Sequence, residues 1–184
     1  MPRSSRAPVG LTAILSSLAA RLLLYPVSDF TDPSSARLSG IILRSARRAA
    51  VHRVVEACVT VGRGLVGDHA QARNPDRGVT LITTADIDAV VERLGRAIDP
   101  RTLRRNLLLE APGQFLRTGQ RYVAGEVILL ITGPCAPCGR MREVLGEPGF
   151  QAMRGHGGMT ARVIQGGCLR IGEMFKPLQL DLFE

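Results

Sequence analysis

The stretch RYVAGEVILLITGPCAPCGRMREVLG, residues 121–146, contains the strongest strand pattern in the chain and two cysteines directly after it. Residues 121–132 are rich in β-branched and aliphatic side chains, which favours a strand. The residues after the first cysteine predict one short helix, because Pro137 suits a first helical turn and Gly146 a helix end. The stretch therefore predicts a strand followed by a helix, with the cysteines at the corner between them.

The remaining sequence from residue 36 onward also predicts mainly strands. Short apolar or β-branched segments bounded by turn residues occur in four further places: 37–45, 52–62, 79–83 and 104–111. Residues 159–175 alternate and turn at a Gly-Gly pair, which predicts a hairpin. Residues 83–99 predict the main helix, since Thr83 and Asp86 have capping-box spacing. Because an open single-layer sheet would expose an apolar face, we predict a mainly β fold: a closed or nearly closed barrel with a few peripheral helices.

Composition and charge narrow the possible partners. Of the 184 residues, 45% are hydrophobic, which is enough for a core, but aromatic residues make up only 4% and tryptophan is absent. Stacking platforms for bases are therefore scarce. The formal net charge is +8, and residues 1–50 carry five of these charges. The charge would suit a small phosphorylated ligand or an anionic membrane, while nucleic acid is not expected as a partner.

The first 35 residues differ from the rest of the chain. A basic start leads into an apolar run that Arg21 interrupts, so the run is too short to span a membrane. A Pro- and Ser-rich segment, 28–36, follows it. We predict that residues 1–35 are an N-terminal extension, flexible or partly helical, and that residues 36–184 form the barrel domain. The expected location is the cytoplasm, although the Arg-rich, acid-poor start also fits an organellar presequence or a signal-like N-terminus.

The cysteines permit several interpretations. Four cysteines in a chain of this length are too few for a disulfide-dense protein, so we expect reduced thiols. If Pro137 begins the helix, backbone N–H groups and the helix dipole face the sulfur of Cys138, which suits a nucleophile or a metal ligand. The alternatives are a thioredoxin-like pair, for which the expected βαβ context is missing, a zinc site completed by Cys168 and His156, and two ordinary turn cysteines.

Other polar residues occur at predicted loop positions. Asp68 and His69 follow a glycine in GLVGDHA, and Asn106 follows the arginines of RTLRRNLL. Arginine forks hold phosphate well, and an amide suits the edge of a ring. A simple turn at Asp68 and a solvated basic face are the alternatives. The glycines of RGHGG, residues 154–158, would let the backbone approach a ligand closely.

Four motifs in this order resemble the MOSC domain, named from the C-terminal domain of molybdenum cofactor sulfurases. They are GxxGDH at 64–69, RxN at 104–106, a long strand ending in Pro-Cys, and GHGGMTARVIQGGCLRIGE at 155–173. The similarity extends from about residue 37 to about residue 177, nearly all the chain beyond the extension. It implies a β-rich fold built around a barrel.

The resemblance also implies roles for particular residues. Cys138 matches the hallmark cysteine, which is proposed to carry sulfur as a persulfide or to ligate molybdenum of a pterin cofactor. Six further residues match the family's cofactor-binding positions. Asp68, His69, Arg104 and Asn106 match its polar positions, and Gly158 and Arg162 match its glycine-rich closing segment. Two positions depart from the family pattern. His69 stands where arginine is usual, and Arg105 stands where an acidic residue is often found.

Two functions follow from the resemblance. In the first, Cys138 accepts sulfur from a partner cysteine desulfurase and passes it on, with Cys135 able to resolve the persulfide as a disulfide; pyridoxal phosphate would belong to the donor protein, because this chain is too short to hold an aminotransferase-like domain. In the second, Cys138 ligates the molybdenum cofactor, molybdopterin, and the chain reduces small N-hydroxylated substrates with a redox partner. A non-enzymatic barrel that binds a small ligand or a partner is the alternative.

Overall fold

The computed structural model describes residues 34–69 and 74–179. These residues form eleven β-strands, two α-helices and two short 3-10 helices. The predicted mainly β class is therefore confirmed. Most of the predicted extension, residues 1–35, lies outside the described residues. Within the described residues, no helix is long and apolar enough to cross a membrane.

Seven strands close into a barrel. They are β1 (Ala36–Arg44), β5 (Val79–Thr83), β6 (Leu107–Glu110), β7 (Arg121–Ala124), β8 (Val127–Pro134), β9 (Met159–Gln165) and β11 (Met174–Pro177). Their order is β11-β7-β8-β9-β5-β6-β1, and β1 pairs with β11 to complete the ring. The neighbours are antiparallel except β5 and β6, which are parallel. A closed ring leaves no strand edge exposed along its circumference.

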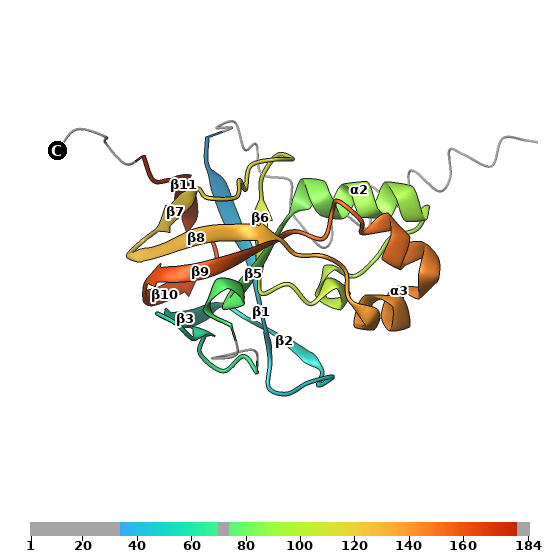
Figure 1. The fold of residues 1–184 in the computed structure, drawn as a ribbon, viewed down its shortest axis with the longest axis horizontal. Helices are drawn as coiled ribbons and strands as arrows, with labels where there is room; N and C mark the ends of the chain where they lie inside the picture. Colours follow the sequence, from blue (N-terminus) through green and yellow to red (C-terminus); the bar gives the residue numbers. More distant parts are fainter. Residues whose placement is uncertain (1–33, 70–73, 180–184) are drawn as a thin grey trace, which may run out of the picture.

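Four further strands surround the barrel. A short strand, β2 (Val51–Val54), extends the end of β1. A second sheet contains β10 (Gly167–Arg170), β3 (Glu56–Thr60) and β4 (Gly64–Leu65) in the order β10-β3-β4. Figure 1 shows this sheet beside the barrel strands β8 and β9.

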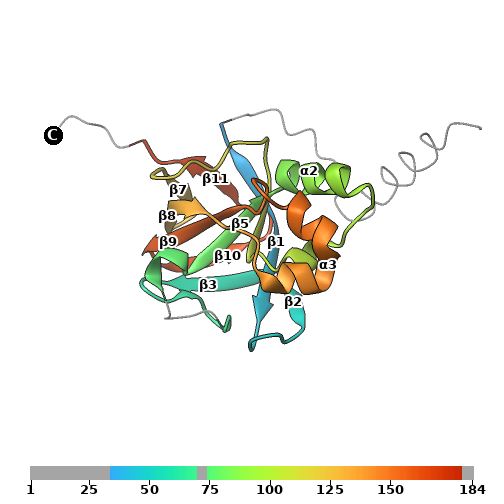
Figure 2. The ribbon, with the colours of Figure 1, turned by 45° about the vertical axis from the view of Figure 1, so that its right-hand side comes forward.

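The helices lie together at one end of the barrel (Figures 1 and 2). Helix α2 (Thr84–Leu94) connects β5 to β6, and helix α3 (Gly139–Ala152) connects β8 to β9. The backbone N–H of Asp86 donates to Thr83 Oγ1 at 3.1 Å, so the predicted cap of α2 is confirmed. Helix α3 is interrupted at Gly146, which has a φ of 74°. The predicted helix end at this glycine thus corresponds to a kink.

Two apolar clusters form the core. One fills the barrel and includes the buried side chains of Leu38, Tyr122 and Phe175. The other lies between the helices and the barrel and includes Val90 and Met141. Both clusters are mostly aliphatic, as the composition requires. The helix end of the barrel is therefore a packed platform, and the loops around it are held in place.

Three predictions of local structure need correction. Residues 121–132 form two strands, β7 and β8, which pair as a hairpin. Residues 159–175 do not form one hairpin, because β9 pairs with β5 and β8 while β10 crosses to pair with β3. The chain does contain a βαβ unit, β5–α2–β6. The two cysteines follow β8, however, and lie outside that unit.

Candidate functional site

Cys138 lies at the N-terminus of α3, at the corner that the sequence predicted. It is the N-cap residue, one position before the helix, and not in the first turn as expected. Its backbone is extended, with φ −109° and ψ 172°, and its thiol is exposed and free. Its side chain makes no capping hydrogen bond. The sulfur is therefore accessible beside the positive end of the helix dipole.

The loop before Cys138 is fixed from beneath. Cys135 is buried, and its backbone N–H donates to Gly158 O at 2.8 Å. The guanidinium of Arg77 lies 3.9 Å from the sulfur of Cys135. A Cβ atom at Gly157 would collide with the carbonyl oxygen of Cys135, so the glycine loop and the cysteine loop pack backbone against backbone. The accessible thiol thus stands on a rigid support.

A buried arginine joins these two loops. The side chain of Arg105 is only 6% exposed and donates to the carbonyl oxygens of Gly157, Cys135 and Leu103. Burial lowers the pKa of Arg105, and the nearby thiols of Cys135 and Cys138 partly oppose this effect. Because an arginine stays charged in proteins, a positive charge lies close to both cysteines.

A second buried network lies beside this loop. Asp68, only 5% exposed, accepts hydrogen bonds from the side chain of Asn106 at 3.0 Å and from Arg44 Nη2 at 3.1 Å. Asn106 also donates to Ile42 O and accepts from the backbone and hydroxyl of Thr80. The carboxylate and the amide therefore bind each other and orient Arg44.

Arg104 directly precedes the two buried residues Arg105 and Asn106 in the chain. It ends the 3-10 helix η2 (Pro100–Leu103) in a left-handed conformation with φ 57°, which is uncommon for arginine. Burial lowers its pKa, and the positive charges of Arg44 and Arg140 lower it further. The negative charges of Asp68 and Cys138 act in the opposite direction. Its Nη1 donates to Ala49 O at 3.0 Å, so the guanidinium is bound to the loop between β1 and β2.

The arginines line a recess beside the start of α3. Its volume is about 380 Å³, and its lining includes Arg48, Arg101, Arg104 and Arg140. The Nε atom of Arg140 is buried and has no hydrogen-bond partner among the described residues. Such an atom is costly to bury unless a ligand or solvent satisfies it. Three of these arginines already pair with carboxylates, Arg101 with Asp99 of the lining and both Arg48 and Arg140 with Glu143. Arg140 Nε is therefore the donor that remains for an anionic group.

The predicted site residues divide into several groups. Asp68 and Asn106 bond to each other, and the backbone N–H of His69 donates to Arg44 O at 2.7 Å within the same network. Arg104 lines the recess beside the start of α3, where Cys138 is the N-cap. Gly158 lies beneath the cysteine loop. Arg162 is exposed on β9 and forms an ion pair with Asp76 of the 3-10 helix η1 (Pro75–Arg77). No motif in the sequence indicated Arg44 or Arg77. Only the fold brings the end of β1 close to Asp68 and the segment before β5 close to Cys135.

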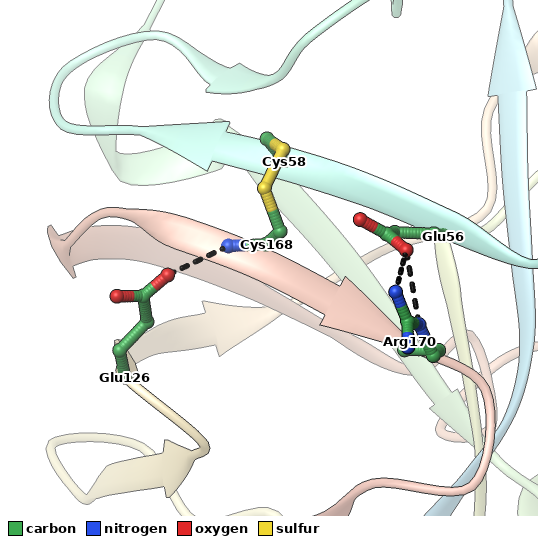
Figure 3. The surroundings of a disulfide bond; sticks show 5 residues. All are labelled: Glu56, Cys58, Glu126, Cys168 and Arg170. Carbon is green, nitrogen blue, oxygen red and sulfur yellow. Dashed lines mark hydrogen bonds and ion pairs between the residues drawn. A yellow bond between two sulfur atoms is a disulfide. The ribbon is translucent and has the colours of Figure 1, made fainter.

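The other two cysteines are joined. Cys58 on β3 and Cys168 on β10 are directly opposite each other and form a disulfide (Figure 3). Beside it Arg170 Nε donates to Glu56 at 2.9 Å, and the backbone N–H of Cys168 donates to Glu126 at 3.3 Å. The expectation of reduced thiols is wrong for this pair. Two cysteines far apart in sequence become neighbours only when the second sheet forms.

The disulfide contradicts the alternative of a zinc site completed by Cys168 and His156. Cys168 is no longer available to join the other cysteines, and His156 lies 3.3 Å from Asp86. In the described ranges, no three His, Cys, Asp or Glu side chains gather as metal ligands. Cys135 and Cys138 remain free thiols, one buried and one exposed.

Two features define the class of this protein. One is a small closed β-barrel, and the other is an accessible thiol at a helix start beside a recess lined by arginines. Residues 68–176, more than half of the chain, match the MOSC domain family. The chain belongs to that family. No curated protein sequence matches it closely enough to count as a relative.

Solved structures share the fold. The YuaD protein from Bacillus subtilis superimposes with a TM-score of 0.69 at 17% identity, covering 79% of this chain and 97% of that one. YiiM from Geobacillus stearothermophilus gives 0.65 at 17% identity, covering 80% and 77%. YiiM from Escherichia coli gives 0.57 at 17% identity, covering 78% and 70%. At such low identity the likeness concerns the fold, and the predicted MOSC-like barrel is confirmed.

Proposed function

We propose that this chain binds a molybdenum-pterin cofactor with Cys138 as a metal ligand. MOSC domains are associated with this cofactor in general. The observation that carries the proposal is the exposed thiol of Cys138 at the N-cap of α3, two residues before Arg140, which lines the arginine recess together with Arg104. A soft thiolate suits such a metal, and arginine forks suit a phosphate.

The residues present fit this group. Cys138 offers one exposed thiol sulfur, and the buried Nε of Arg140 offers a donor that no described residue accepts. The four arginines outnumber the two carboxylates that pair with them, Asp99 and Glu143, so the net charge around the recess is positive, as an anionic cofactor requires. Because Asp68 and Asn106 are already bonded to each other, their contribution would be to hold Arg44 and the loop in place.

The bound metal would supply redox chemistry, and the chain's own groups would position the reactants. Cys138 would fix the metal at the start of α3, and Arg104 with Arg140 would hold the cofactor phosphate. Arg105 would keep the cysteine loop in place through its bonds to Cys135 and Gly157. The activity we propose is reduction of a small N-hydroxylated substrate, with electrons from a redox partner.

Sulfur transfer is a second candidate, supported by the free thiol pair. In this reaction the thiolate of Cys138 attacks the outer sulfur of a donor persulfide, and the donor leaves as a thiolate. The exposure of Cys138 meets the requirement for access. Burial of Cys135 leaves Cys138 as the accessible acceptor of the two.

Metal and sulfur analysis of the purified chain, made in a host that produces molybdenum cofactor, tests the proposal. About one molybdenum per chain is expected if the cofactor function holds. Cyanide-labile sulfur without metal would favour sulfur transfer and contradict the cofactor function. Absence of both, with ligand binding unchanged by Cys138→Ser, would favour a non-enzymatic binding barrel.

A further inference from the structure

A second hollow borders residues 134–137, which precede Cys138, whereas the arginine recess borders Arg140 and Val144, which follow it. The second hollow has a volume of about 620 Å³, and its lining includes Thr83 and Asp86 at the start of α2 and residues 134–137 before Cys138. A concave site of this size can enclose a small organic molecule. Because residues 134–137 lead directly to Cys138, a molecule bound here would lie beside the loop that carries the thiol.

Much of the wall is apolar. The apolar side chains in the lining are Leu116, Pro134, Ala136, Pro137, Phe150, Met153 and Met159. Leu116 and Met153 are buried members of the two core clusters, and Phe150 packs against the second. These supports make the wall a fixed surface for an apolar ring or chain.

One oriented carboxylate lies in this wall. Asp86 Oδ2 accepts a hydrogen bond from the hydroxyl of Thr83 at 2.9 Å, and Asp86 Oδ1 lies 3.3 Å from the ring nitrogen Nδ1 of His156. The side chain of Asp86 is 22% exposed, so it can still be reached. An ionised carboxylate accepts about four hydrogen bonds, and it therefore retains capacity for a donor from a ligand.

A positive group at the rim opposes the carboxylate. Arg154 also lines the hollow, is exposed, and places its guanidinium 5.9 Å from the centre of the Phe150 ring. An exposed arginine is solvated and stabilises an anion weakly. Asp86 is less exposed and is held by two partners, so we expect it to dominate the charge preference.

We propose that this hollow binds a small molecule with an apolar body and a positively charged nitrogen group that donates to Asp86. The binding preference is independent of the proposed function. The further step, that the bound molecule is the substrate of the Cys138 chemistry, rests on the proposed function. The hollow would then select substrates by charge, while the arginine recess holds the cofactor.

Three probes with one ring and different charges test this preference: benzylamine, benzyl alcohol and benzoate. Their dissociation constants are measured by NMR titration of the metal-free full chain. Benzylamine should bind about tenfold more tightly than benzoate, because it forms a charge-assisted hydrogen bond. Equal affinities, or tighter binding of benzoate, would overturn the proposal without any variant.

Variants then locate the preference. Asp86→Asn should reduce the ratio between benzylamine and benzoate, while Glu92→Gln, an exposed charge on the same helix, should leave it unchanged. An unchanged ratio in a folded Asp86→Asn protein would contradict the assignment; if that variant does not fold, the comparison of the three probes on the wild-type chain decides.

The same titrations separate this inference from the cofactor function. Cys138→Ser should keep the preference, because its side chain is not part of the hollow's lining. A preference for benzylamine in a chain that acquires no molybdenum would contradict the cofactor function and leave this inference intact. Molybdenum in a chain without the preference would sink this inference alone.

Discussion

Asn106 uses all of its side-chain hydrogen-bonding groups inside the protein. Its oxygen accepts from the backbone N–H and the hydroxyl of Thr80 at 3.1 and 2.8 Å, and its nitrogen donates to Ile42 O and to Asp68. The residue is only 2% exposed. It therefore acts as a junction between β1, β5 and the loop that carries Asp68.

Replacement of this junction should be costly. Asn106→Leu removes one hydrogen-bond donor from the buried carboxylate of Asp68 and removes the side-chain partners of Thr80 N and Ile42 O, and each such loss costs about 1–3 kcal/mol. We expect the free energy of unfolding to fall by about 3 kcal/mol or more in urea denaturation. Gln151→Leu, at an exposed position on α3, is the control. Equal stability of the two variants would contradict the role of the junction.

Gly158 also has a supporting role. Its φ is 77°, and a Cβ atom would collide with the carbonyl oxygen of Leu81. Gly119 has a similar φ of 84° but open space around it. Gly119→Ala should lower stability by the roughly 1–2 kcal/mol that the left-handed conformation alone costs. Gly158→Ala should lower it by several times that amount, because the close contact is added. Similar melting temperatures for both variants would mean that the close contact is unimportant.

The sequence was sufficient to predict the accessible thiol and the cap of α2, because both depend on local patterns around Cys138 and Thr83. It was not sufficient to predict Arg44 as the partner of Asp68. That pairing depends on the end of β1 meeting the loop after β4. Ionic partners from distant elements have no local pattern, so only the fold reveals them.

At the scale of elements, the second sheet is attached to the protein through β3 and β10. The disulfide between Cys58 and Cys168 spans 110 positions of the chain. The backbone N–H of Val66, after β4, donates to Cys58 O at 2.8 Å, so the segment that leads to Asp68 is connected to the same sheet. The hairpin prediction for residues 159–175 failed here because Gly167 starts a strand in another sheet.

Removal of the disulfide should lower stability. Closing so long a loop restricts the unfolded chain, and the chain-entropy estimate for a loop of this length is about 4–5 kcal/mol, with typical values of 2–4 kcal/mol. The Cys58→Ser/Cys168→Ser protein should unfold at lower urea concentration than the oxidised wild type. Its stability should match that of the reduced wild type. Equal stability of the oxidised and reduced wild type would show that the bridge is absent or without effect.

At the scale of the whole molecule, closure of the ring depends on β7 and β11. Tyr122 of β7 is 1% exposed, donates its hydroxyl to Phe115 O and accepts from the backbone N–H of Arg117 at 3.2 Å. Burial raises the pKa of Tyr122. The neutral phenol is therefore favoured in the folded state.

Alkaline pH should weaken the barrel. An acid with a raised pKa in the folded state contributes stability below its unfolded pKa, about 10 for tyrosine, and this contribution is lost as the pH rises through the folded value. Wild-type stability should fall above about pH 10, and Tyr122→Phe should show a smaller fall. Parallel curves for the two proteins in urea titrations at several pH values would argue against this role.

The barrel class followed from the density of strand patterns and the need to cover an apolar face. The parallel pair β5–β6 and the separate second sheet did not, because strand order depends on contacts between distant segments. Four of the chain's arginines gather in the recess beside α3. The central claim concerns the thiol next to that recess.

The most direct test compares three proteins made in a host that produces molybdenum cofactor: wild type, Cys138→Ser and Cys135→Ser. Molybdenum and pterin are quantified per chain after purification. Wild type should contain both, Cys135→Ser should keep most of its metal, and Cys138→Ser should lose it while remaining folded. Equal molybdenum in wild type and Cys138→Ser would contradict the assignment of Cys138 as the ligand.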